Sequence, residues 1–169
     1  PPPAGPTDAS GWANGALTST KAEPKIVSAP ISGVAVTQKA TVLVTVGAVS
    51  ESQSSVAATP ATIEAGSGSA TITVAARDSL GNPIGGATLV LGASGAGNTL
   101  TPPTTFTDAS GGATGTLSSI TAEPKTVSAT INGVAVGQTA PVNVTVGAVS
   151  GSRARGAAAP AHDGRAGGG

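Results

Sequence analysis

The sequence predicts an all-β sandwich built as a tandem repeat, and three observations predict it. Residues 101–150 repeat residues 1–50 without insertion or deletion, and 33 of the 50 aligned positions are identical. Ser, Thr, Gly, Ala and Val dominate the composition, which favours strands and turns over helices. Short segments in which apolar and polar residues alternate are separated by Gly-, Pro- and Asn-rich turn signals.

The repeat defines the domain organisation. A period of 100 residues is that of a whole domain, because solenoid units are about 20–50 residues long. We therefore expect residues 1–50 to be the second half of one module, residues 51–150 to be a complete module, and residues 151–169 to be a disordered tail. The tail has few apolar residues larger than Ala and cannot form a core.

Composition excludes several classes of function. The formal net charge is zero and only 9% of residues are charged, so no basic surface is available for nucleic acid. The absence of cysteine excludes disulfides and thiolate metal sites. No apolar run approaches the roughly 20 residues that span a membrane. With Trp12 and Phe106 as the only aromatic residues, the core must consist of Val, Ile, Leu and Ala.

The first half of the complete module contains two predicted strand regions. The segment with Val56, Ala58 and Ile63 is interrupted by Pro60, and because proline lacks a backbone donor we expect the strand either to be split or to switch sheets there. Residues 69–77 alternate with period two, which predicts a strand with one buried face. The residues of that face are Ala70, Ile72, Val74 and Ala76.

A turn cluster at residues 78–83 follows, and then a strand at residues 87–93 with Leu89 and Leu91 facing inward. Gly, Ala and Ser predominate in the loop that begins at residue 92. We expect Leu100 and Phe106 to fill the core on either side of two prolines.

The second half of the module contains three more predicted strands, at residues 113–119, 126–131 and 139–146. Asn132-Gly133 predicts a hairpin with a type I′ turn, whose two central residues need positive φ. About seven strands in this length are typical of an immunoglobulin-like sandwich. The side chains expected to point inward are Leu117, Val127, Ala129, Ile131, Val142, Val144 and Val146.

Three sequence blocks resemble bacterial Ig-like domains of the invasin/intimin type. They are SATITVAARDSLGNPIGGATLVL at residues 69–91, TDASGGATGTL at residues 107–117, and VSATINGVAV followed by VNVTV within residues 127–146. The resemblance implies a rigid extracellular stalk on a bacterial surface, anchored in the outer membrane and carrying its adhesive function elsewhere. It implies neighbouring Ig-like repeats as partners, and a host or surface ligand bound through other domains.

The first copy poses a pairing question. Residues 7–47 correspond to the last strands of a module, and three strands alone cannot close a sandwich. Residues 54–91 could in principle pair with either copy. The link of about seven residues after Val46 reaches at most roughly 25 Å, so we expect pairing with the later copy and an under-packed first copy. A strand-swapped dimer is the hazard.

No catalytic, cofactor-binding or metal site is predicted. The complete module has five carboxylates and no His or Cys, and His162 lies in the tail, so no nucleophile–base pair is available in the fold. Asp78 and Asp108 each begin a D-x-x-G turn. An Asx turn is favoured over a calcium ligand, because calcium needs six to eight oxygens.

Three further features have two interpretations each. Trp12 replaces the Gly112 of the other copy, either as a binding anchor or as tolerated variation in an exposed turn. Asn143 begins an N-x-T sequon in a predicted strand, where chance is the better explanation. The Glu-Pro-Lys sequence at residues 123–125 is expected to be a turn with solvated charges, with a contact across a module junction as the alternative.

We therefore predict a non-enzymatic extracellular stalk module that acts as a spacer in a tandem array. One alternative is a ligand-binding module, in which loops 78–86, 92–106 and 133–138 recognise a glycan or a host protein. Another is a spacer of a secreted enzyme or of a phage structural protein.

Overall fold

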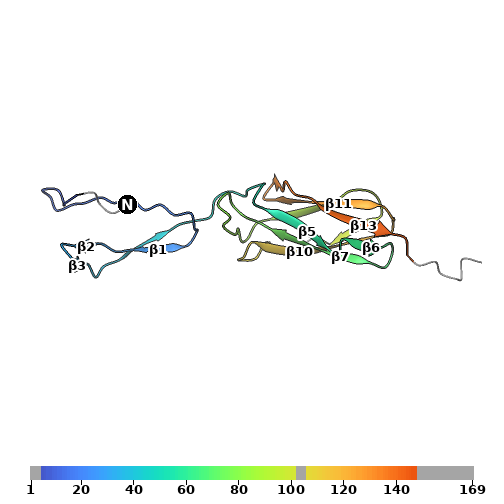
Figure 1. Ribbon diagram of the computed structural model, residues 1–169, viewed down its shortest axis with the longest axis horizontal. Coiled ribbons are helices and arrows are strands. Elements are labelled where there is room, and N and C mark those ends of the chain that lie inside the picture. The colour runs from blue at the N-terminus through green and yellow to red at the C-terminus, as the bar shows by residue number, and fades with distance from the viewer. Residues whose placement is uncertain (1–4, 102–105, 148–169) are drawn as a thin grey trace, which may run out of the picture.

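The computed structural model describes residues 5–101 and 106–147 (Figure 1). The described chain is elongated and has two parts that follow each other along its long axis. The first part contains four short strands, and the second contains nine strand segments that enclose a core. No helix is present in either part, as the composition predicts.

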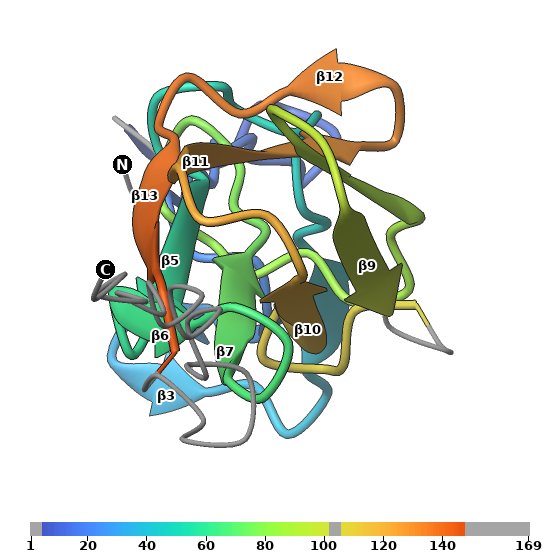
Figure 2. The ribbon, with the colours of Figure 1, turned by 90° about the vertical axis from the view of Figure 1, so that its right-hand side faces the viewer.

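The second part is a sandwich of two sheets, and Figure 2 views it along its length. One sheet has the order β5-β7-β10-β9, and the other has the order β12-β11-β13-β6 with β8 paired to β11. All pairings are antiparallel except that of β6 with β13. The strands are β5 (Ser55–Thr59), β6 (Thr62–Glu64), β7 (Ser69–Ala75), β8 (Leu89–Ala93), β9 (Asn98–Thr101), β10 (Gly112–Ser119), β11 (Pro124–Ile131), β12 (Val134–Ala135) and β13 (Ala140–Thr145).

The chain changes sheets at Pro60, which is one of the two predicted alternatives. Residues before the proline form β5 and pair with β7, whereas residues after it form β6 and pair with β13. This switch lets one short edge segment contribute to both layers. It places Val56 and Ile63 in the same core from opposite sheets.

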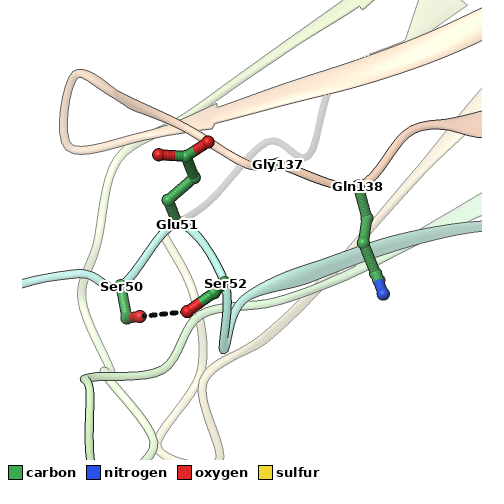
Figure 3. A pocket seen from close by; sticks show the side chains of 5 residues that line it. All are labelled: Ser50, Glu51, Ser52, Gly137 and Gln138. Atoms are coloured by element: carbon green, nitrogen blue, oxygen red, sulfur yellow. Dashed lines mark hydrogen bonds between the residues drawn. The ribbon is translucent and has the colours of Figure 1, made fainter.

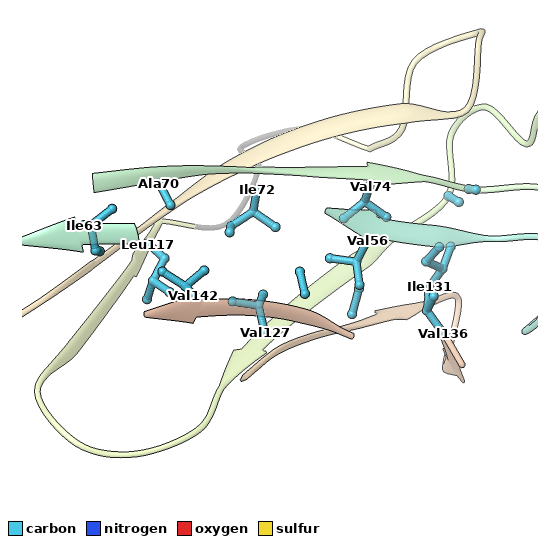
Figure 4. Packing of buried hydrophobic residues seen from close by; sticks show 14 of the residues in the cluster. Val56, Ile63, Ala70, Ile72, Val74, Leu117, Val127, Ile131, Val136 and Val142 are labelled. Carbon is cyan, nitrogen blue, oxygen red and sulfur yellow. The ribbon is translucent and has the colours of Figure 1, made fainter. Parts of the chain in front are cut away.

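A cluster of buried hydrophobic side chains lies between the sheets, and all of its members are aliphatic (Figure 4). Buried and exposed residues alternate along β7 and β11, so the predicted inward faces of these strands are confirmed. Leu89, Leu91 and Leu100 pack at the margin and are partly buried. The least exposed apolar side chains are Ala70, Ile72, Val74, Ala76, Ala87, Leu117, Val127, Ile131 and Val142.

Two predicted core residues lie outside the core. Phe106 is 61% exposed, because the adjacent Thr107 takes the inward position and is itself buried. The Thr107 hydroxyl donates to the Ile84 carbonyl and accepts from the Ala87 N–H. Val146 is 79% exposed, because β13 ends at Thr145.

The predicted hairpin turn at Asn132-Gly133 is confirmed, and the first copy has the same turn. Asn132 and Gly133 have φ values of 48° and 83°, as a type I′ turn requires. Ser32 and Gly33 repeat this geometry with φ values of 49° and 82°. The turn therefore forms independently of the core beneath it.

The first copy has the same strand register as the second, but its apolar side chains are not buried. Its strands are β1 (Pro24–Val27), β2 (Pro30–Ile31), β3 (Val34–Ala35) and β4 (Ala40–Leu43). Lys25 pairs with Val42, just as Lys125 pairs with Val142. However, Val27, Ile31 and Val42 are 39%, 59% and 42% exposed.

Residues 12–19, which correspond to β10, form no strand. In the later copy β10 pairs with β7. This confirms the prediction that residues 54–91 pair with the later copy. The first copy has no described strand in the place of β7. Strand formation at this sequence thus depends on the opposing partner.

The two copies offer a matched pair of core substitutions. Ile131→Ala removes a side chain that is 0% exposed, and should lower the free energy of unfolding by about 2–5 kcal/mol. Ile31→Ala changes the equivalent exposed residue and should cost less than about 0.5 kcal/mol. Denaturant unfolding of both variants measures this difference. Equal losses would contradict the assignment of the core.

Candidate functional site: the junction between the two copies

A buried carboxylate, that of Asp78, lies where the two parts meet. The chain leaves β7, passes Arg77, and forms the turn 78–82 at the end of the sandwich that faces the first copy (Figure 1). Arg77 accepts a backbone hydrogen bond from Ser50 N–H at 2.8 Å. Val49 forms an isolated antiparallel bridge with Asp78, so the linker lies along this turn.

Asp78 is 2% exposed, and its carboxylate accepts four hydrogen bonds. Three come from within its own turn: Leu80 N–H at 2.9 Å, Asn82 N–H at 2.8 Å and the Asn82 side-chain amide at 2.9 Å. The fourth comes from Gly47 N–H in the first part, at 3.0 Å. Asp78 therefore joins its turn to the segment that precedes the linker.

These donors stabilise the ionised form of Asp78. The hydrogen bond from Gly47 and those from the Asn82 side chain, Asn82 N–H and Leu80 N–H lower the pKa of Asp78 to about 2. Burial acts in the opposite direction and is outweighed. The carboxylate is thus charged at neutral pH, and its charge is compensated by donors alone.

Asn82 makes the second link between the parts. Its side-chain carbonyl accepts from Ala22 N–H at 3.1 Å, and its side-chain amide donates to the Thr20 carbonyl at 2.9 Å. The same amide group donates to Asp78. One side chain therefore fixes the loop 20–22 against the carboxylate. We call Asp78, Asn82 and their partners Thr20, Ala22 and Gly47 the junction clamp.

The same turn occurs twice more without a partner across a junction. Asp108 accepts from Ser110 N–H, Gly112 N–H and the Ser110 hydroxyl. The Ser110 hydroxyl and the Gly112 N–H lower the pKa of Asp108. Asp8 accepts from Ser10 N–H and Trp12 N–H. The predicted Asx turns are therefore present, and Asp78 differs by its bond to Gly47.

No cation site is assembled around these carboxylates. Within residues 5–101 and 106–147, no three Asp, Glu, His or Cys side chains lie together in an arrangement that could hold a metal ion. The Asp78 oxygens face N–H donors, whereas a calcium ion needs oxygen ligands. This geometry does not support the alternative in which Asp78 or Asp108 is a calcium ligand.

The prediction of solvated charges at residues 123–125 is wrong for Lys125. Its side chain is 0% exposed, and Glu123 is 37% exposed. The Lys125 ammonium pairs with Glu123 and donates to the Ala96 carbonyl at 2.5 Å. The pairing lowers the pKa of Glu123. Period-two alternation places Lys125 on the same face as Val127 and Ala129. The sequence pattern therefore indicates a buried position for Lys125.

The remaining candidates lie apart from the clamp. Trp12 is 71% exposed. Asn143 lies exposed in β13, where its backbone N–H donates to the Ala61 carbonyl.

A hollow beside the linker is lined by Ser50, Glu51, Ser52, Gly137 and Gln138 (Figure 3). None of these lining residues is aromatic, and a hydrogen bond of 3.4 Å joins the two serine hydroxyls.

Comparison with known proteins places this sandwich in a family. Residues 50–147 match the family model described as invasin, domain 3. The chain belongs to this family. The predicted resemblance to the invasin/intimin type is therefore confirmed, and this invasin domain-3 chain is an adhesin-like module of the bacterial cell surface. No curated protein matches the sequence.

Solved structures agree with this assignment. The Escherichia coli adhesin FdeC is 26% identical over 76% of the chain, with a TM-score of 0.63. Invasin, described as a bacterial integrin-binding protein, is 27% identical over 83%, with a TM-score of 0.56. InvD of Yersinia pseudotuberculosis shares the fold at 21% identity over 88%, with a TM-score of 0.64. The chain covers only 42%, 28% and 45% of these structures, respectively. The described residues contain no helix of the length and hydropathy needed to cross a membrane.

The depressed pKa of Asp78 predicts a pH dependence. An ordinary aspartate titrates near 3.9, whereas Asp78 should titrate near 2. Its contribution to stability is therefore complete above about pH 5 and is lost as the pH falls through about 4 to 2. Carboxyl-carbon NMR titration measures the midpoint. Asn82→Ala removes the side-chain amide donor and keeps the backbone N–H, so it should raise the midpoint. A midpoint near 3.9 in the unmodified chain would contradict the clamp.

The Glu123–Lys125 pair predicts an asymmetric response to substitution. Glu123→Ala leaves the Lys125 ammonium buried without its counter-charge and should lower the melting temperature clearly. Lys125→Met removes the charge and keeps most of the volume, so it should be better tolerated. Glu23→Ala is the matched control, because Lys25 remains 26% exposed and can be solvated. The reverse order of melting temperatures would show that the pair does not stabilise the fold.

Proposed function

We propose that this chain is a non-enzymatic stalk segment of a bacterial adhesin, acting as a spacer in a tandem array of Ig-like modules. In this proposal residues 1–50 are the second half of one module, residues 51–150 are a complete module, and residues 151–169 lie outside the repeat. The array would be extracellular and held at the outer membrane through other regions. Adhesion to a host or surface ligand would reside in other domains.

The junction clamp is the observation that carries this proposal. Three hydrogen bonds link Asp78 and Asn82 to backbone groups of the first copy, and one backbone bond joins Ser50 to Arg77. A linker held in this way restricts the angle between neighbouring modules. A restricted angle is what a spacer needs in order to set a distance from the cell surface.

The alternative functions have less support. In the ligand-binding alternative, loops 78–86, 92–106 and 133–138 would contact a glycan or a host protein. Loop 78–86 is already engaged in the junction, and loop 133–138 contains no aromatic residue. Loop 92–106 contains a single aromatic residue, the exposed Phe106, and its residues 102–105 lie outside the described residues. A spacer of a secreted enzyme or a phage structural protein would use the same clamp, and the sequences that flank the array would distinguish these cases.

Restriction of the junction can be measured as a distance distribution. Because the chain has no cysteine, Thr45→Cys and Thr116→Cys provide two exposed spin-label sites, one in each part. Double electron–electron resonance should give a narrow distribution that widens in Asn82→Ala. Ser110→Ala changes the equivalent turn that makes no contact across the junction, and should leave the width unchanged.

A broad distribution in the unmodified chain would contradict the spacer proposal. A narrow distribution that does not respond to Asn82→Ala would show that restriction comes from the backbone of the linker alone. That result would contradict the proposal that the clamp restricts the junction.

A further inference from the structure

The end of the complete module that lies away from the first copy carries backbone groups equivalent to those that bind Asp78 and Asn82 in the junction clamp. Thr20, Ala22 and Gly47 supply the carbonyl and the two N–H groups that bind Asn82 and Asp78. At the repeat offset of 100 residues, their equivalents are Ile120, Ala122 and Gly147. We call these three the acceptor end.

The local geometry of the acceptor end is already formed. In the first copy the Ser19 hydroxyl bonds to the backbone of Lys21, and Val44 N–H donates to the Glu23 carbonyl. The second copy repeats both features. Its Ser119 hydroxyl bonds to the backbone of Thr121, and its Val144 N–H donates to the Glu123 carbonyl.

The buried lysine strengthens this arrangement. In both copies the lysine of the Glu-Pro-Lys sequence pairs with its glutamate. In the complete module Lys125 also binds the Ala96 carbonyl, and Ile120 N–H donates to the Gly97 carbonyl. The segment 119–125 is thus tied to the loop beside it and is better fixed than its counterpart in the first copy.

The acceptor end has no occupant among the residues that the structure describes. The Ile120 carbonyl and the Ala122 and Gly147 N–H groups have no hydrogen-bond partner within residues 5–101 and 106–147. Ala122 is exposed, whereas Ala22 is half-buried by the junction. Ile120 is 78% exposed and lines a hollow with Gly66, Ser67, Gly68, Ser69, Thr99, Ser118 and Ser119.

We propose that the acceptor end binds the Asp78–Asn82 turn of a further copy of module 51–150. The incoming carboxylate would accept from Gly147 N–H, and the incoming amide would accept from Ala122 N–H and donate to the Ile120 carbonyl. All three groups belong to the backbone, so the replacement of Thr20 by Ile120 leaves the recognition intact. This inference rests on the proposed tandem array and names the surface at which a further module would dock.

The partner is defined by the chemistry of the observed junction. A carboxylate and a carboxamide four residues apart, held by one Asx turn, match two N–H groups and one carbonyl. The Asp108 turn resembles this one but has a glycine, Gly112, in the place of Asn82. It therefore lacks the amide that bridges to the carbonyl and cannot substitute for the Asp78 turn.

A chain lengthened by one module tests the proposal. A second copy of residues 51–150 is inserted directly after residue 150, and solvent exchange of backbone amides is followed by NMR. The Ala122 and Gly147 amides should exchange at least about tenfold more slowly than in the original chain, because a docked turn closes them to solvent. Placing Asp78→Asn or Asn82→Ala in the inserted copy alone should remove this protection, and Ser110→Ala there should not.

Unchanged exchange at Ala122 and Gly147 would overturn the proposal, as would protection that survives both substitutions. The Ala22 and Gly47 amides serve as the internal reference in the same spectra. If they stay protected while Ala122 and Gly147 do not, the acceptor end fails but the observed junction and the spacer proposal stand. If all four exchange freely, the junction clamp itself fails.

Discussion

Burial of one aliphatic core between two sheets is the constraint on which the rest of this structure depends. The two copies have 33 identities in 50 aligned positions, yet only the second copy buries its apolar side chains. Val127 and Ile131 are each 0% exposed, whereas Val27 and Ile31 are 39% and 59% exposed. Hairpin turn and strand register form in both copies. A strand in the place of β10 forms only where β7 is present.

The junction follows from the same constraint. β7 is the strand through which the sheet β5-β7-β10-β9 is held together, and its continuation delivers Asp78 to the end of the module. Because Asp78 is buried by the turn and the linker, its charge needs the four donors that surround it. One of those donors belongs to the first copy. Folding of the complete module therefore prepares the contact with its neighbour.

Much of the fold could be predicted from residue patterns. Alternation along β7 and β11, the break at Pro60 and the Asn132-Gly133 turn each reflect local chemistry that sequence displays directly. Phe106 departs from the expectation that a large apolar side chain is buried, because the adjacent Thr107 takes the inward position and bonds two backbone groups. Lys125 is buried as its period-two position indicates, although its charge favours an exposed position. The bonds of Asp78 to Gly47 and of Asn82 to Ala22 join residues 31 and 60 positions apart, and no local pattern indicates them.

Hydrogen exchange compared between matched amides of the two copies tests the dependence on core closure most directly. If core closure governs stability, the amides of Val127, Ala129 and Ile131 exchange only with global unfolding, while those of Val27, Ala29 and Ile31 exchange orders of magnitude faster. Equal protection in the two copies would mean that the first copy has a partner for its apolar face, and would contradict the dependence on core closure.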